Sequence, residues 1–384
     1  MKPRYLPFFP FALLVGIFLV GCSLLGSPET PTPLPTLVQA TPTLVVLASP
    51  TAINVLPSET PTPVTPTSTP IPPTPTAAPT AVPVRFSFAP GTTAGSVKGT
   101  LSPGQTQNIL FNAGYGQLTF ITADSPNRDV TFGLSGANGQ VLLDPSQKWT
   151  SWKGYLPATQ DYIVQLTGGT TTENYEVTFV MPVRISFAAG ATSGGAKGTL
   201  APYQVQSYVV SAGAGVPMQV STNNANTTIA LFGASDGVVL ISASSAVKGY
   251  PGDWQYLPST QDYVAQVIAP ASAQNYSLVI SIPARISFAP GATSATVSGA
   301  TVNGNVVEYV AKAGAGQTMD LKLTPSGGPA VLLLYGLQTG QWLLYSNQGK
   351  KTFSTSLPAT QDYIIGVVPT SGTVVNYTLK VSIH

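Results

Sequence analysis

Few residues of this chain could act as a nucleophile, a general base or a soft metal ligand. Its 384 residues include one histidine, the terminal His384, and one cysteine, Cys22. A serine or cysteine nucleophile needs a base with a pKa near neutrality, usually histidine, and a zinc site needs several Cys or His ligands. We therefore expect no catalytic residue, no enzyme activity, no metal site and no cofactor.

Carboxylates are the remaining candidates for chemistry. Glycoside hydrolysis requires two of them, but only one acid recurs in an internal repeat of about a hundred residues. The recurring acids, each followed by a tyrosine, are Asp161-Tyr162, Asp262-Tyr263 and Asp362-Tyr363. We interpret each aspartate as an acceptor for turn amides and each tyrosine ring as part of the core. A ligand site repeated three times is the alternative.

One unrepeated segment, Asp124-Ser-Pro-Asn-Arg-Asp129, groups three oxygen ligands of the kind that calcium prefers. It lacks the glycine and the distal glutamate of an EF-hand loop. Arg128 also opposes a cation, so the segment alone does not indicate a metal site.

Aromatic side chains near the recurring Leu-Pro motif are candidates for ligand binding. Trp254 and Tyr256 lie three residues and one residue before Leu257, which places both on the strand face opposite that leucine. Tyr155 is the equivalent of Tyr256 in the preceding copy. An outward pair of rings could stack against a sugar or a partner. Packing against a neighbouring loop or module is the alternative.

Self-comparison shows three copies of one module. Arg85-Phe-Ser-Phe-Ala-Pro-Gly91 returns as Arg184-Ile-Ser-Phe-Ala-Ala-Gly190 and Arg285-Ile-Ser-Phe-Ala-Pro-Gly291, and Leu156-Pro-Ala-Thr-Gln-Asp-Tyr162 returns twice in the same way. Within a copy, apolar and polar residues alternate with the period of two that is typical of half-buried strands. The sequence therefore predicts an all-β protein with three tandem antiparallel jelly-roll-like β-sandwiches, at 83–182, 183–283 and 284–384.

The N-terminal segment has the pattern of an export signal, with Lys2 and Arg4 before an apolar run that ends in Leu19-Val-Gly-Cys22. This tetrad resembles the lipobox of bacterial lipoproteins, which implies acylation of Cys22 and anchoring to a membrane. The absence of Asp after the cysteine points to the outer membrane in a cell that has one. We thus expect residues 1–22 to be a lipoprotein signal peptide with its lipobox, and the protein to be exported to the periplasm or cell surface.

Residues 23–82 repeat Thr-Pro and Pro-Thr units, which predicts a disordered linker with extended polyproline character. The chain has 16 basic and 14 acidic residues, and removal of Lys2 and Arg4 would make these numbers equal. No basic surface for nucleic acid is indicated.

The repeated motifs resemble the bacterial pre-peptidase C-terminal domain and periplasmic inhibitors of g-type lysozyme. The resemblance spans residues 83–384 and implies a jelly-roll-like sandwich with an accessory or inhibitory role. Our leading hypothesis is a non-catalytic, envelope-anchored lipoprotein whose modules bind glycan or an envelope protein. Inhibition of g-type lysozyme is the alternative, although the loops expected to reach a lysozyme, at 168–173, 269–274 and 369–375, contain no Lys or Arg.

Overall fold

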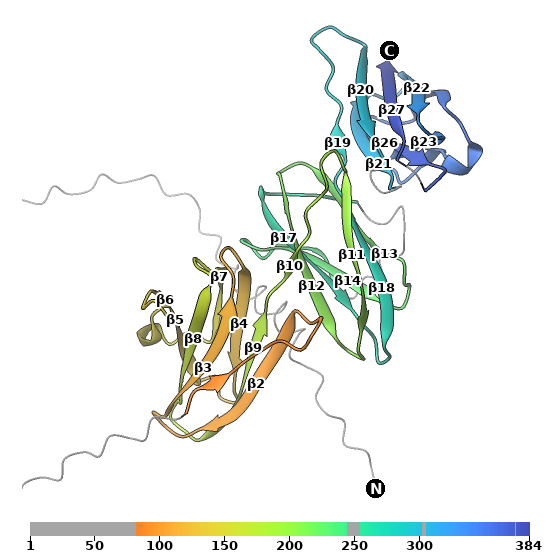
Figure 1. Ribbon diagram of the computed structural model, residues 1–384. Helices are drawn as coiled ribbons and strands as arrows, with labels where there is room; N and C mark the ends of the chain where they lie inside the picture. The colour runs from red at the N-terminus through yellow and green to blue at the C-terminus, as the bar shows by residue number, and fades with distance from the viewer. Residues whose placement is uncertain (1–81, 244–253, 302–304, 373) are drawn as a thin grey trace, which may run out of the picture. The chain divides into compact units, whose positions relative to one another are not determined.

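The computed structural model describes residues 82–243, 254–301, 305–372 and 374–384 (Figure 1). These residues belong to one compact unit, Thr80–His384. Their regular secondary structure is almost entirely strand, and the strands form six sheets in three repeated β-sandwich units, as the sequence predicted. In the described ranges the helical segments are two single 3₁₀ turns, η1 (Pro145–Gln147) and η2 (Ser346–Gln348). Residues 1–81, with the expected signal, Cys22 and most of the linker, lie outside the described part.

The first module has nine strands. They are β1 (Val84–Arg85), β2 (Ala94–Leu101), β3 (Thr106–Ala113), β4 (Leu118–Asp124), β5 (Thr131–Gly136), β6 (Val141–Leu143), β7 (Ser151–Tyr155), β8 (Gln160–Thr167) and β9 (Glu173–Val180).

The second module repeats this order. Its strands are β10 (Val183–Arg184), β11 (Ser193–Leu200), β12 (Val205–Ala212), β13 (Pro217–Thr222), β14 (Thr228–Gly233), β15 (Val239–Ile241), β16 (Trp254–Tyr256), β17 (Gln261–Ile268) and β18 (Gln274–Ser281).

The third module repeats it again. Its strands are β19 (Ala284–Arg285), β20 (Ser294–Ala300), β21 (Val307–Ala313), β22 (Thr318–Ser326), β23 (Ala330–Gly336), β24 (Trp342–Leu344), β25 (Thr352–Ser356), β26 (Gln361–Pro369) and β27 (Asn376–Ile383).

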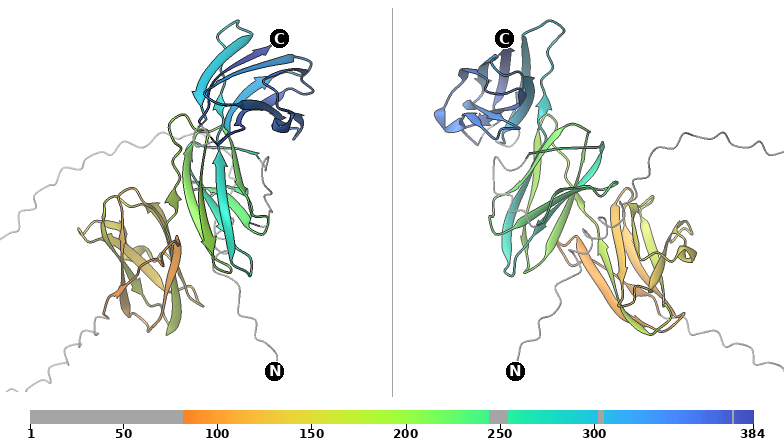
Figure 2. Two further views of the ribbon diagram at one scale, coloured as in Figure 1. Left: turned by 45° about the vertical axis from the view of Figure 1, so that its right-hand side comes forward. Right: turned by 180° about the vertical axis from the view of Figure 1, so that it is seen from behind.

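Each module is a sandwich of a five-stranded and a four-stranded sheet (Figure 2). In the first module the sheet orders are β1-β3-β8-β5-β6 and β2-β9-β4-β7, and the other two modules have the corresponding orders. All pairings are antiparallel except the one made by the first short strand, such as β1 with β3. This parallel strand carries the recurring arginine, so the motif that opens each repeat lies at the edge of the five-stranded sheet.

The cores form because every second side chain of a strand faces the opposite sheet. In β27, Tyr377, Leu379 and Val381 are buried, whereas the intervening Thr378 and Lys380 are exposed. Each module has its own cluster of buried apolar residues. The recurring tyrosines 162, 263 and 363 are fully buried in these clusters, which confirms the core position predicted for their rings.

Candidate functional site

The recurring Leu-Pro-x-Thr-Gln-Asp-Tyr motif builds one corner of each sandwich. The hydroxyl of Tyr162 donates to the carbonyl of Ala158 at 2.7 Å, and Tyr263 and Tyr363 bond in the same way four residues back. The motif threonine accepts from a backbone N–H of another turn, as Thr159 does from Tyr115 at 2.9 Å. These bonds close the turn that precedes β8, β17 and β26. The residues therefore maintain the fold.

The recurring aspartate has a different role from the one expected. Asp161 accepts two hydrogen bonds from Arg85, at 2.8 and 3.0 Å, and one from Asn112 at 2.9 Å. Asp262 pairs with Arg184, and Asp362 pairs with Arg285 at 2.9 and 3.0 Å. The prediction of turn-amide partners is wrong, because the registry of three strands brings a cation to the carboxylate.

The pairing of β1 and β8 with the central strand β3 sets this contact. Arg85 lies opposite Leu110 on β3, and Asp161 lies opposite Asn112 on the same strand. Leu110 and Asn112 are two residues apart and so face the same side of the sheet. The arginine and the aspartate therefore meet across β3, on the sheet face that points away from the core of the module.

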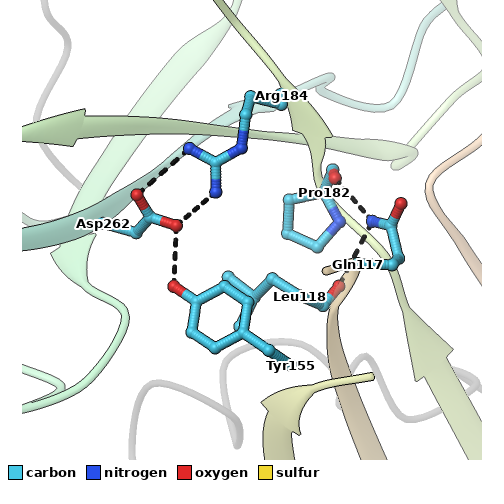
Figure 3. Close-up of polar contacts among 6 residues, drawn as sticks. All are labelled: Gln117, Leu118, Tyr155, Pro182, Arg184 and Asp262. Carbon is cyan, nitrogen blue, oxygen red and sulfur yellow. Dashed lines mark hydrogen bonds and ion pairs between the residues drawn. The ribbon is translucent and has the colours of Figure 1, made fainter. Parts of the chain in front are cut away.

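Tyrosines from the preceding module complete two of these pairs. Tyr155, at the end of β7, donates its hydroxyl to Asp262 at 2.7 Å (Figure 3). Tyr256, at the end of β16, donates to Asp362 at 2.9 Å and accepts from Gln338 at 2.8 Å. An Arg-Asp pair with a tyrosine of the previous module is called a junction triad below. The described chain has two of them, Arg184-Asp262-Tyr155 and Arg285-Asp362-Tyr256.

Exposure differs between the completed triads and the first pair. The side chain of Asp161 is 36% exposed, against 10% for Asp262 and 9% for Asp362. Arg85, followed by Asn112, holds the pKa of Asp161 at about 2. Burial alone would raise the pKa of Asp262 and Asp362, but the hydrogen bonds from arginine and tyrosine outweigh it and lower both. All three aspartates are thus acceptors at neutral pH.

The junction tyrosines show the opposite shift. Burial, with the hydrogen bond to the Asp262 carboxylate, raises the pKa of Tyr155 to about 12. The same causes raise the pKa of Tyr256 above its ordinary value. Both hydroxyls therefore keep their protons and act as donors over the physiological range.

A second contact also repeats at each junction. The backbone N–H of Ser207 donates to the Thr93 hydroxyl at 2.8 Å, and that of Glu308 donates to the Thr192 hydroxyl at 2.7 Å. Both threonines are buried. At the first junction Lys153 also donates to the carbonyl of Ser235 at 2.7 Å.

Trp254 lies at the second junction. Its ring is half-buried and packs against an apolar cluster of the third module that includes Val310, Leu333, Tyr335 and Ile364. The expected position on the face opposite Leu257 is confirmed, because Leu257 lies in the core of the second module and Trp254 does not. What covers this face is the next module. A ligand-binding role for Trp254, Tyr256 and Tyr155 stays a prediction, but the protein itself already provides each of them with a partner.

A different aromatic group, not predicted from the sequence, is partly exposed on the third module, where Trp342 also packs against the same apolar cluster as Trp254. Trp342 of β24 stacks on Tyr345 with ring centroids 4.8 Å apart, and its edge contacts Tyr335 at 5.2 Å. Tyr345 is 47% exposed. The first and second modules have Val141 and Val239 in place of Trp342. The only signal in the sequence is this difference between copies.

The described residues were also compared with the requirements of a metal site and of a membrane span. In the described ranges no group of three or more His, Cys, Asp and Glu residues could hold a metal ion. His384 lies 3.7 Å from Asp320 at the end of the third module. None of the described helical segments is long and apolar enough to span a membrane.

Comparison with known proteins gives partial structural matches. No protein-family model matches the chain, and no curated protein matches it. Among solved structures, the periplasmic inhibitor of g-type lysozyme from Aeromonas hydrophila, PliG, is 28% identical over 27% of this chain and 96% of its own, with a TM-score of 0.24. PliG from Salmonella Typhimurium is 25% identical over 26% of this chain and 96% of its own, with a TM-score of 0.23. Each alignment spans about the length of one module.

Proposed function

We propose that this chain is a non-catalytic, envelope-anchored lipoprotein that binds cell-surface glycan through its third module. The stacked pair Trp342 and Tyr345 carries the proposal. Aromatic faces cover the apolar faces of sugar rings, and a ring that is partly exposed and held by a neighbour loses little freedom on binding. The pair is absent from the other two modules, which have the same strand order, so the shared fold does not require it.

The junction triads support a role in presentation. Each combines a charge-assisted Arg-Asp pair with a tyrosine from the neighbouring module, and each is accompanied by a buried Thr-amide bond. Such bonds limit the freedom of consecutive modules. Acylation at Cys22 and the Pro/Thr-rich segment 23–82 would anchor this array and hold it away from the membrane, with the outer membrane as the site in a cell that has one.

Inhibition of g-type lysozyme is the alternative that the sequence resemblance implies. An inhibitor must place a protruding loop in a substrate cleft. The loops of this chain that correspond to those of the related inhibitors contain no Lys or Arg, and the first of them uses Thr170, Thr171 and Glu173 in contacts within its own module. We therefore favour glycan binding.

A pull-down of the purified protein with insoluble cell-wall glycan tests the proposal. Tyr345→Ala should weaken binding several-fold, because loss of one aromatic contact costs about 1 kcal/mol. The matched control is Tyr115→Ala, since Tyr115 is a turn tyrosine of the first module with 79% exposure. Equal retention of both variants, or no retention of the wild type, would refute glycan binding through Tyr345. Inhibition of a g-type lysozyme by wild type and Tyr345→Ala alike would instead favour the alternative.

A further inference from the structure

Two carboxylates of the first module meet at the end of the sandwich where the β4–β5 loop approaches the start of β9. Asp129 uses its Oδ2 atom to accept from the backbone N–H and hydroxyl of Thr170, at 2.8 and 3.1 Å. Glu173 uses its Oε1 atom to accept from the Asn127 amide and from the Thr171 hydroxyl at 3.2 Å. Each carboxylate thus has one satisfied oxygen.

The second oxygen of each carboxylate is buried and unsatisfied. Asp129 Oδ1 and Glu173 Oε2 have no hydrogen-bond partner in the described part of the chain, and Glu173 is only 5% exposed. The two carboxyl groups contact the adjacent residues Thr170 and Thr171, so they lie close together. In the same ranges neither forms an ion pair with a Lys or Arg side chain. A buried carboxylate oxygen without a donor is costly unless a positive charge lies beside it, so the two oxygens favour a bound cation.

The equivalent positions of the other modules show how the fold avoids this cost. Gln274 replaces Glu173 in the second module, where it accepts a hydrogen bond from Asn224 at 2.8 Å. Val375 takes the same place in the third module and is fully buried among apolar residues. A neutral residue therefore suffices for folding. The carboxylate pair is a particular property of the first module.

A glycine in the neighbouring loop leaves room for the Asp129 carboxyl group. A Cβ atom on Gly169 would lie about 2 Å from the Asp129 carboxyl carbon, so a residue with a side chain could not replace this glycine without displacing Asp129. The adjacent loops also contribute the Asn127 amide and the Thr171 hydroxyl. Together these groups form a set of hard oxygen ligands.

We propose that Asp129 and Glu173 bind a calcium ion, with oxygens of Asn127 and Thr171 and water completing its coordination. Calcium accepts six to eight oxygen ligands in variable geometry, whereas magnesium demands a nearly ideal octahedron. The amide of Asn127 can present its oxygen by rotation of the terminal group. The ion compensates the two buried oxygens and ties the β4–β5 loop to the segment before β9. This inference is independent of the proposed glycan binding.

Isothermal titration calorimetry of the purified, EDTA-treated protein with calcium chloride tests the site. We expect one saturable site per chain with a dissociation constant on the order of 10⁻⁴ M, as in extracellular calcium modules, and no comparable heat with magnesium chloride. Glu173→Gln, which reproduces the residue of the second module, and Asp129→Asn should each abolish the saturable heat. Glu176→Gln is the control, because Glu176 lies on the same strand but pairs with Lys98 at 3.1 Å.

The proposal fails on either of two results. Absence of saturable heat in the wild type at calcium concentrations up to 10-fold above the expected dissociation constant would show that the carboxylate pair binds no calcium. Unchanged calcium binding in both carboxylate variants would place the ion elsewhere. Circular dichroism verifies that each variant is folded, and the two substitutions are at independent positions, so failure of one to fold leaves the other as the test.

Discussion

Loss of one hydroxyl at the second junction gives the sharpest test of the junction triads. Tyr256→Phe removes the donor to Asp362 and the acceptor for Gln338 but keeps the ring. Hydrogen bonds to charged groups contribute about 1.5–3 kcal/mol when buried. Tyr256 is 39% exposed, and Asp362 keeps its bonds to Arg285, so solvent screening reduces the expected loss to about 1 kcal/mol.

Scanning calorimetry measures this loss of stability and also shows whether one module unfolds alone or together with its neighbours. A change of 1 kcal/mol shifts the melting temperature by about 4–8 °C if a module of some hundred residues unfolds alone, and by about 2–4 °C if neighbouring modules unfold with it. The control is Tyr115→Phe, whose ring lies in an exposed turn and whose hydroxyl has no hydrogen bond in the described part of the chain. Tyr155→Phe should have an effect that adds to that of Tyr256→Phe, because the two triads share no residue.

Two outcomes would refute this reasoning. If Tyr256→Phe and Tyr115→Phe left the melting temperature equally unchanged, the hydroxyl would contribute nothing to the junction. If Tyr256→Phe lowered it by much more than 8 °C, the hydroxyl would be a larger part of the fold than one partly exposed hydrogen bond allows.

Three further predictions concern the junctions and the anchor. Trp254→Ala should lower the free energy of unfolding by about 2 kcal/mol in urea titrations, less than the 3–5 kcal/mol of a fully buried tryptophan; an unchanged midpoint would mean that the ring does not pack on the third module. Because the pKa of Tyr155 is raised to about 12 from about 10 in the unfolded chain, its contribution is complete below pH 10 and is lost between pH 10 and 12, so the stability difference between wild type and Tyr155→Phe should vanish over that interval in urea titrations. Cys22→Ser should release the protein from membranes or leave it unprocessed, and equal membrane association of mutant and wild type after detergent-free fractionation would contradict acylation.

The fold could be predicted from the sequence because its signals are local and repeated. Strand periodicity placed Trp254 and Tyr256 on the face opposite Leu257, and the structure agrees. The material that covers that face could not be predicted, since it comes from β21, β23 and β26 of the next module, more than fifty residues away. Sequence spacing gives the direction of a side chain but not its distant neighbour.

The prediction for the recurring aspartate was wrong for a related reason. Aspartate near a turn favours local hydrogen bonds, and that preference predicted turn-amide partners for Asp161. The parallel pairing of β1 with β3 instead brings Arg85 to it, across 76 residues. A usable signal was present, because arginine and aspartate recur in all three copies, whereas the tyrosine is present at 155 and 256 but is replaced by Ser356 in the last copy.

Differences between the three copies follow position along the array. The first module has an Arg-Asp pair without a donor tyrosine in the described chain, and the last module has a serine where the donor would lie. Thr293 is exposed in the last module, whereas its equivalents Thr93 and Thr192 are buried in junctions.

The outer face of the four-stranded sheet is also apolar where a module follows and polar in the third module. Phe120 of the first module contacts Phe232 of the second, with ring centroids 6.4 Å apart, whereas the third module has the partly exposed Asp320 at the equivalent position. A buried junction favours aromatic and hydroxyl groups, and a solvated end favours charge and short polar side chains. The third copy therefore lacks the groups through which the first two contact a following module, but it keeps the Arg285-Asp362 pair that accepts the tyrosine of the preceding module.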